Sequence, residues 1–222
     1  MLEETDHAFL TRFAGVAPAR EALWLEALTH GSTGHERNYE RLEFLGDRVL
    51  GLVIAEWLYE LGTGDEGKLS QRLNALVTRS MCAAIGRGIG LGAHVRLGKQ
   101  ASDDGARNSD NVLGDVMEAL LGASFVTLGF EGARAIVRRL WNEAITGEAG
   151  QAKHPKSALQ EWAAGNKRKS PQYRLVERSG PDHAAKFKVA VAINGVGEAE
   201  GMGSSKQDAE TEAAKEFLKK FG

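Results

Sequence analysis

The sequence contains little cysteine, little proline and no long hydrophobic run. Its 222 residues include one cysteine and four prolines. The single Cys82 excludes an intrachain disulfide and a cysteine-based zinc site, and it is typical of a reducing compartment. No uninterrupted apolar run approaches the roughly 20 residues of a membrane-spanning helix, and the N-terminal segment is acidic where a signal peptide is basic. The sequence therefore predicts a cytoplasmic protein outside the membrane.

The charges are abundant and unevenly distributed. Charged residues make up 26% of the chain and hydrophobic residues 42%, which is typical of a folded domain. Residues 1–150 carry 15 basic and 21 acidic side chains, a net charge of −6, whereas residues 151–222 carry 13 and 9, a net charge of +4. This asymmetry predicts an acidic body followed by a basic part that binds a polyanion. The alternative is a chance imbalance.

Hydrophobic periodicity predicts an all-α domain over residues 1–147. Helices are expected at 21–29, 39–61, 68–85, 112–128 and 132–145. The glycine-rich segment 86–109 predicts a long irregular connection or short helical turns. Gly62 and Gly129 follow two of these segments, where glycine commonly ends a helix. Strand-like alternation is absent from this part of the sequence.

The pattern changes after a short polar linker at residues 148–154. Residues 155–222 predict a small α+β domain of order α-β-β-β-α. Its helices are expected at 156–164 and 205–220, and its strands at 172–178, 186–193 and 196–202. Asn194-Gly195 supplies the turn between the last two strands.

Two acidic clusters lie on predicted helices of the first domain. Glu40, Glu43 and Asp47 have the spacing i, i+3, i+7, which places them on one helical face. A solvated acidic stripe is the usual explanation of such a pattern. Asp115 and Glu118 lie three residues apart among apolar neighbours, where solvation explains them less well. If the two helices cross, these carboxylates converge into an oxygen-only site of the kind that suits Mg²⁺ or Mn²⁺.

Two further residues bear on this site. Gly46 lies inside the first acidic helix, at a cost of about 1 kcal/mol relative to alanine. A close approach of backbone to another element would justify that cost. Glu66, in the segment GDEGKLS, is a further candidate acid, and an exposed loop acid is the alternative.

Four segments together resemble the signature of bacterial ribonuclease III. They are ERLEFLGD (40–47), THGS (29–32), DEGKLS (65–70) and LGDVMEALLGA (113–123), in that family's order and spacing. The resemblance implies that the catalytic metal cluster consists of Glu43, Asp47, Asp115 and Glu118. It implies Mg²⁺ as the cofactor, with Mn²⁺ as a substitute, and secondary roles for Glu40 and Glu66.

The same resemblance implies an assembly and a product. It implies a homodimer in which Phe44 packs into the partner, although an ordinary core position is the simpler interpretation of this residue alone. Two active sites would cut both strands of duplex RNA, leaving 5′-phosphate and 3′-hydroxyl ends with two-nucleotide 3′ overhangs. The expected role is processing of rRNA, mRNA and other RNA precursors. Two positions depart from the family: Gly31 replaces a basic residue, and Tyr39 replaces an asparagine found in many members.

Residues 155–222 are similar to a double-stranded RNA-binding domain. A-form RNA hides its base edges in a deep major groove, so recognition relies on shape, 2′-hydroxyls and phosphates. The resemblance implies that Gln160 and Glu161 meet one minor groove, His183 the next, and Lys206 the phosphates between them. Each residue alone is more simply an ordinary surface side chain. Gln207 and Asp208 follow Lys206 where the family commonly has basic residues, which predicts a modest affinity.

The residue patterns, together with the resemblance, predict a homodimeric, Mg²⁺-dependent endoribonuclease that hydrolyses double-stranded RNA. Two alternatives differ in class. An RNA-binding protein that has lost catalysis should also have lost some of the four acids, which are present. A phosphohydrolase of small nucleotides would have no need of a C-terminal RNA reader.

Overall fold

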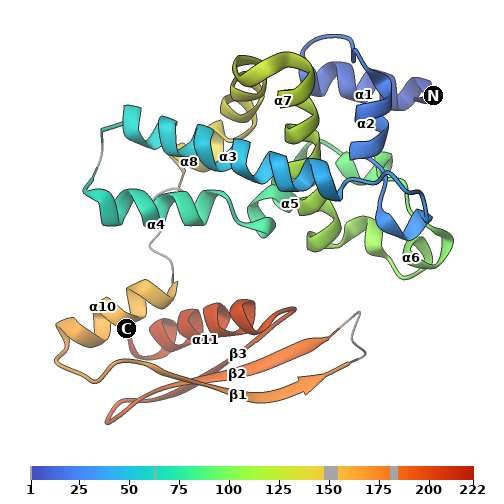
Figure 1. The fold of residues 1–222 in the computed structure, drawn as a ribbon. Helices are drawn as coiled ribbons and strands as arrows, with labels where there is room; N and C mark the ends of the chain where they lie inside the picture. The colour runs from blue at the N-terminus through green and yellow to red at the C-terminus, as the bar shows by residue number, and fades with distance from the viewer. Residues whose placement is uncertain (1, 63, 148–154, 181–184) are drawn as a thin grey trace. The chain divides into compact units, whose positions relative to one another are not determined.

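The computed structural model describes residues 2–62, 64–147, 155–180 and 185–222 (Figure 1). The chain forms two compact units, Met1–Ala152 and Lys153–Gly222. The predicted linker at 148–154 lies outside the described residues.

The first unit is helical, as predicted. Its α-helices are α1 (Glu4–Ala14), α2 (Glu21–Ala27), α3 (Glu40–Glu60), α4 (Glu66–Leu76), α5 (Arg79–Gly88), α6 (Lys99–Asp103), α7 (Asp110–Leu140) and α8 (Asn142–Thr146). Three 3₁₀ turns accompany them: η1 (Gly31–Thr33), η2 (Leu91–His94) and η3 (Ala106–Asn108). Among the described residues of this unit, extended pairing is limited to one parallel bridge between Thr29 and Arg96.

Helix α7 is the centre of this unit and packs against both α3 and α5 (Figure 1). Its length and composition would allow it to cross a membrane, but 61% of its most apolar window is buried inside the unit. Gly129 interrupts the helix with φ 72° and ψ −178°. The break falls where the sequence predicted a helix end, because glycine tolerates positive φ.

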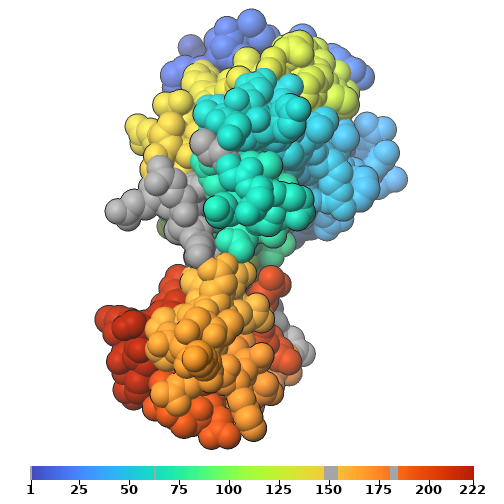
Figure 2. Space-filling model, turned by 90° about the vertical axis from the view of Figure 1, so that its left-hand side faces the viewer, coloured from blue at the N-terminus to red at the C-terminus, as the bar shows by residue number. Residues whose placement is uncertain are grey.

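The predicted single helix at 68–85 is wrong, since this segment forms two helices. Thr78 has extended backbone, and its hydroxyl accepts a hydrogen bond from the backbone N–H of Met81 at 3.2 Å. This N-cap ends one helix and begins another, and the shared hydrophobic period conceals the break. The result places α4 beside the end of α3 on one face of the unit (Figure 2), while α5 packs on α7. Helix α1, which the periodicity did not predict, buries Phe9, Leu10 and Phe13.

The second unit has the predicted α-β-β-β-α order. Its elements are α10 (Pro155–Gly165), β1 (Gln172–Ser179), β2 (Lys186–Ile193), β3 (Gly197–Gly203) and α11 (Lys206–Phe221). The antiparallel sheet has the order β1-β2-β3, and α11 packs on its β2 and β3 strands (Figure 1). A Cβ atom on Gly201 would lie 2.1 Å from the backbone nitrogen of Ala213, so this glycine lets α11 approach β3. Phe217 fills the small core beneath.

Candidate active site

Helices α3 and α7 cross in backbone contact at two glycines. A Cβ atom on Gly46 would lie 1.7 Å from the carbonyl oxygen of Glu118, and one on Gly122 would lie 2.2 Å from that of Leu42. No side chain fits at either position without moving a helix. The predicted reason for Gly46 is therefore confirmed, and the crossing brings residues 43–47 of α3 beside residues 115–118 of α7.

The four central carboxylates act on one another electrostatically. Burial raises the pKa of Glu118 to about 8, and the charges of Asp47, Asp115 and Glu43 contribute to this rise in that order. Burial also raises the pKa of Glu43, followed by the charge of Asp115. The pKa of Asp115 is likewise raised, chiefly by burial. The fold thus gathers two acids from each helix in a partly buried position where their negative charges repel.

Basic and polar neighbours hold two of these acids. Arg79 Nε donates to Asp115 Oδ1 at 2.9 Å, and the Tyr39 hydroxyl donates to Asp115 Oδ2 at 3.3 Å. Arg48 forms an ion pair with Asp47. With the side chains in these positions, the described parts of the chain contain no group of three or more His, Cys, Asp or Glu residues arranged to bind a metal ion.

The donor set nevertheless fits a hard divalent cation. The acids Glu43, Asp47, Asp115 and Glu118 offer only oxygen, the element that Mg²⁺ and Mn²⁺ prefer. Burial and the repulsion between neighbouring acids raise the pKa values of Glu43 and Glu118. A positive charge placed among these acids stabilises their ionised forms and so offsets both causes.

Sequence reasoning missed three contacts of this cluster. Tyr39 is only a departure from the family in the sequence, yet its buried ring brings the hydroxyl to Asp115. Cys82 is fully buried, as its apolar neighbours predict, and its Sγ also lies 3.8 Å from Glu118 Oε1. Burial raises the pKa of the Cys82 thiol, which keeps it protonated. Arg79 carries no signal in the sequence, because the boundary between α4 and α5 was not predicted.

The two secondary acids have different positions. Glu40 begins α3, and its charge helps to raise the pKa of Glu43. Its Oε1 would lie 3.4 Å from a Cβ atom on Gly31, so the position that departs from the family faces Glu40. Glu66 begins α4, where it is exposed and accepts a hydrogen bond from the Ser70 hydroxyl at 3.1 Å. The charge of Glu66 is not among the main causes of the raised pKa values of Glu43, Asp115 and Glu118.

Phe44 is 65% exposed, so the alternative of an ordinary core position is wrong. The Arg48 guanidinium lies over its ring, 4.7 Å from the centroid. Leu52 and Tyr59 follow at spacings of eight and seven residues and are 58% and 79% exposed. Such spacing places the three apolar side chains along one face of α3.

The RNA-binding candidates of the second unit lie at its surface. Gln160 and Glu161 are exposed on α10. Lys206 is exposed as the first residue of α11, next to the N-cap Ser205, whose hydroxyl accepts from the backbone N–H of Asp208 at 3.1 Å. His183 lies outside the described residues.

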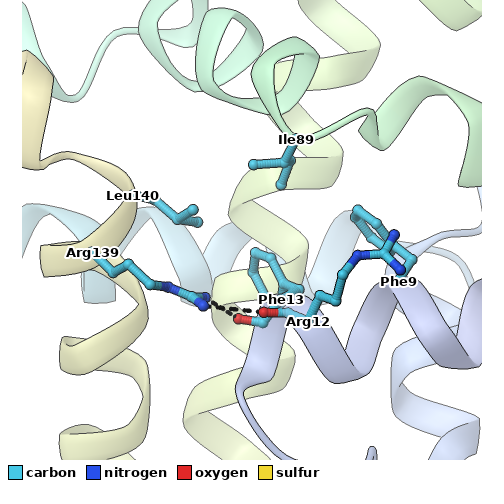
Figure 3. Close-up of a pocket in the computed structure, with 6 residues that line it drawn as sticks. All are labelled: Phe9, Arg12, Phe13, Ile89, Arg139 and Leu140. Carbon is cyan, nitrogen blue, oxygen red and sulfur yellow. Dashed lines mark hydrogen bonds between the residues drawn. The ribbon is translucent and has the colours of Figure 1, made fainter.

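A separate apolar cavity of about 280 Å³ lies between α1, the end of α5 and the end of the α7 segment (Figure 3). Its lining residues are Phe9, Arg12, Phe13, Ile89, Arg139 and Leu140. The Arg139 guanidinium donates to the backbone carbonyls of Arg12 and Phe13, which closes one side. None of the candidate acids lines this cavity, so it is separate from the carboxylate cluster.

Comparison with known proteins agrees with both units. A family described as Ribonuclease-III-like matches residues 20–144, and the double-stranded RNA binding motif matches residues 155–221. The chain is 54% identical over 212 residues to Ribonuclease 3 of Zymomonas mobilis, covering 95% of this chain and 86% of that protein. It is 44% identical to Ribonuclease 3 of Rhodobacter capsulatus, covering 96% and 95% of the two chains.

A solved structure resembles the first unit. The nuclease domain of ribonuclease III from Campylobacter jejuni superposes with a TM-score of 0.57 at 35% identity, covering 60% of this chain and 93% of that chain. The helical unit with its crossed acidic helices, the RNA-binding unit and the extent of these matches lead to one assignment. The chain belongs to the ribonuclease III family and is an endoribonuclease that acts on double-stranded RNA.

Proposed function

We propose that Glu43, Asp47, Asp115 and Glu118 bind the divalent cation with which this nuclease cleaves RNA. The observation that supports this most is the glycine-mediated crossing of α3 and α7, which holds four mutually repelling carboxylates together. Mg²⁺ is the proposed cofactor and Mn²⁺ its substitute. The chemistry that such a cation supplies when bound is activation of water and neutralisation of charge on the phosphodiester.

The residues of the chain orient these ligands. The Tyr39 hydroxyl fixes one oxygen of Asp115, and the backbone contact between Gly46 and Glu118 fixes the separation of the two acidic helices. Glu40, on the turn that precedes Glu43, has a secondary role in organising substrate or metal. Glu66 has a secondary role toward the substrate, since its exposed carboxylate lies on another helix.

The second unit positions the duplex. Gln160 and Glu161 would face one minor groove from α10, and Lys206 with the start of α11 would face the phosphates beyond it. The proposed boundaries are 1–147 for the nuclease domain and 155–222 for the RNA-binding domain. Residues 148–154 and the proposed RNA-contacting His183 lie outside the described residues.

The working enzyme is proposed to be a homodimer. The exposed stripe Phe44, Leu52 and Tyr59 offers an apolar surface of the kind that proteins cover with a partner. The similar nuclease domain from Campylobacter jejuni has a structurally flexible region involved in dimer formation. Two sites in one dimer would cut both strands and leave 5′-phosphate and 3′-hydroxyl ends with two-nucleotide 3′ overhangs.

The proposed cellular role is processing of rRNA, mRNA and other RNA precursors in the cytoplasm. This role is proposed from the double-stranded RNA substrate and from the relatives named Ribonuclease 3.

The test is cleavage of a long end-labelled RNA duplex, beside the single strand, in Mg²⁺, Mn²⁺ or chelator. We expect metal-dependent conversion of the duplex alone into short 5′-phosphorylated duplexes. Glu118→Gln should reduce the rate about 1,000-fold or more while duplex binding persists, because it removes a ligand and leaves the second unit intact. Cleavage in chelator, or near-normal cleavage by this variant, would contradict the proposed metal site.

A further inference from the structure

Arg79 lies against the acid cluster, although no motif of the sequence includes it. It is the first residue of α5, and its Nε donates to Asp115 Oδ1 at 2.9 Å. Its side chain is 55% exposed, whereas that of Asp115 is 15% exposed. One guanidinium, itself largely exposed, therefore holds a largely buried ligand of the proposed site.

The fold fixes this arginine at its base. A Cβ atom on Gly114 would lie 2.5 Å from Arg79 Cγ and 2.9 Å from the Arg79 carbonyl oxygen. The stem of the side chain thus packs directly on α7, one residue before Asp115. The Thr78 cap begins α5 at this point. Arg79 is held by two helices, whereas a typical surface ion pair is free to separate.

We propose that Arg79 is a positioning residue whose guanidinium competes with a divalent cation for Asp115 and thereby sets the affinity of the site. This inference rests on the proposed metal site. Asp115 already gives one oxygen to Arg79 and the other to Tyr39. Two positive groups close to one carboxylate repel, so the cation must displace the guanidinium or bind less tightly beside it. The exposed end of Arg79 can swing toward solvent while its stem remains packed.

The experiment is isothermal titration of the full-length protein with Mn²⁺ and with Ca²⁺, after chelator treatment and without RNA. Arg79→Gln keeps the atoms that pack on Gly114 and removes the charge. We expect it to bind both cations about tenfold more tightly than the unsubstituted protein. Arg79→Lys keeps the charge and should stay within about threefold of the unsubstituted protein.

Arg87→Gln is the matched control. Arg87 is also on α5, and it joins α5 to the start of α7 by an ion pair with Asp110 and a hydrogen bond to the Asn108 carbonyl at 2.9 Å. Its loss removes an equivalent arginine–aspartate contact away from the four acids. We expect Arg87→Gln to leave both cation affinities unchanged.

Thermal unfolding gives a readout independent of activity. Arg79→Gln should lower the Tm in chelator and recover it at saturating Ca²⁺, because the cation replaces the lost positive charge. Arg87→Gln should lower the Tm equally in both conditions. Unchanged or weaker cation binding by Arg79→Gln, with normal binding by the unsubstituted protein, overturns the inference alone. If the unsubstituted protein binds neither cation, or Glu118→Gln binds them equally well, the metal site itself is wrong and the inference falls with it.

Discussion

The two units of this protein use charged residues in opposite ways. The first has a net negative charge and gathers four acids where two helices touch through glycine, partly buried and mutually repelling. The second has a net positive charge and presents its RNA-binding candidates Gln160, Glu161 and Lys206 at the surface. Repulsion inside a fold costs stability, whereas exposed charges cost little. The first arrangement favours a cation bound at one point, and the second favours a long polyanion bound along a surface.

The close helix contacts give the largest test of this comparison. Gly46→Ala should destabilise the first unit by about 3 kcal/mol or more and abolish cleavage, because a methyl group would meet the Glu118 carbonyl at the α3–α7 crossing. Gly201→Ala, at the β3–α11 contact, should instead damage the second unit and weaken duplex binding. Circular dichroism measures the loss of folded structure, a cleavage assay measures the loss of activity, and a binding assay measures the loss of duplex affinity. Equal damage to both functions by either variant would show that the two units do not fold independently.

Removal of the basic second unit tests whether it supplies duplex binding while the first unit supplies cleavage. Deletion of residues 151–222 should weaken duplex binding about 10- to 100-fold at physiological salt, since phosphate contacts dominate affinity and depend on ionic strength. Cleavage at low salt should persist, because all four proposed ligands remain. A salt series of filter-binding and cleavage measurements separates the two effects. Loss of cleavage at every salt concentration would mean that the second unit does more than bind the duplex.

The buried acids also predict how stability depends on pH. The pKa of Glu118 rises from its ordinary 4.5 to about 8 in the fold, so folding favours the protonated form. In chelator this contribution is complete below about pH 4.5 and is lost as the pH rises toward 8. Glu118→Gln should therefore stabilise the protein near pH 8, by about 2 kcal/mol after discounting for partial exposure, and have little effect near pH 4.5.

Urea unfolding at several pH values measures this effect. Glu131→Gln serves as the control, because Glu131 is 79% exposed and follows the Gly129 break in α7. Its stability should follow the unsubstituted protein across the pH range. A parallel shift of Glu118→Gln at all pH values would show that its effect comes from packing and not from proton binding.

The sequence predicted the elements that carry a strong local signal. The helical period located α3 and α7, the glycine at 129 marked the break in α7, and the alternation of Val189, Val191 and Ile193 located β2. The prediction failed at 68–85 because the cap at Thr78 leaves the hydrophobic period unbroken. It also left Phe44 open between core and surface, since periodicity gives a face of a helix and not what covers it.

The sequence by itself determined two domains, their charges and the acids that define the family signature, because these depend on local order and residue type. The tertiary structure decided which groups touch those acids. Tyr39, Arg79 and Cys82 lie 76, 36 and 36 positions from their acidic partners along the chain. These distant neighbours meet because the glycines at 46, 114 and 122 let three helices pack backbone against backbone. Such a contact has no local signature in the sequence beyond the missing side chain.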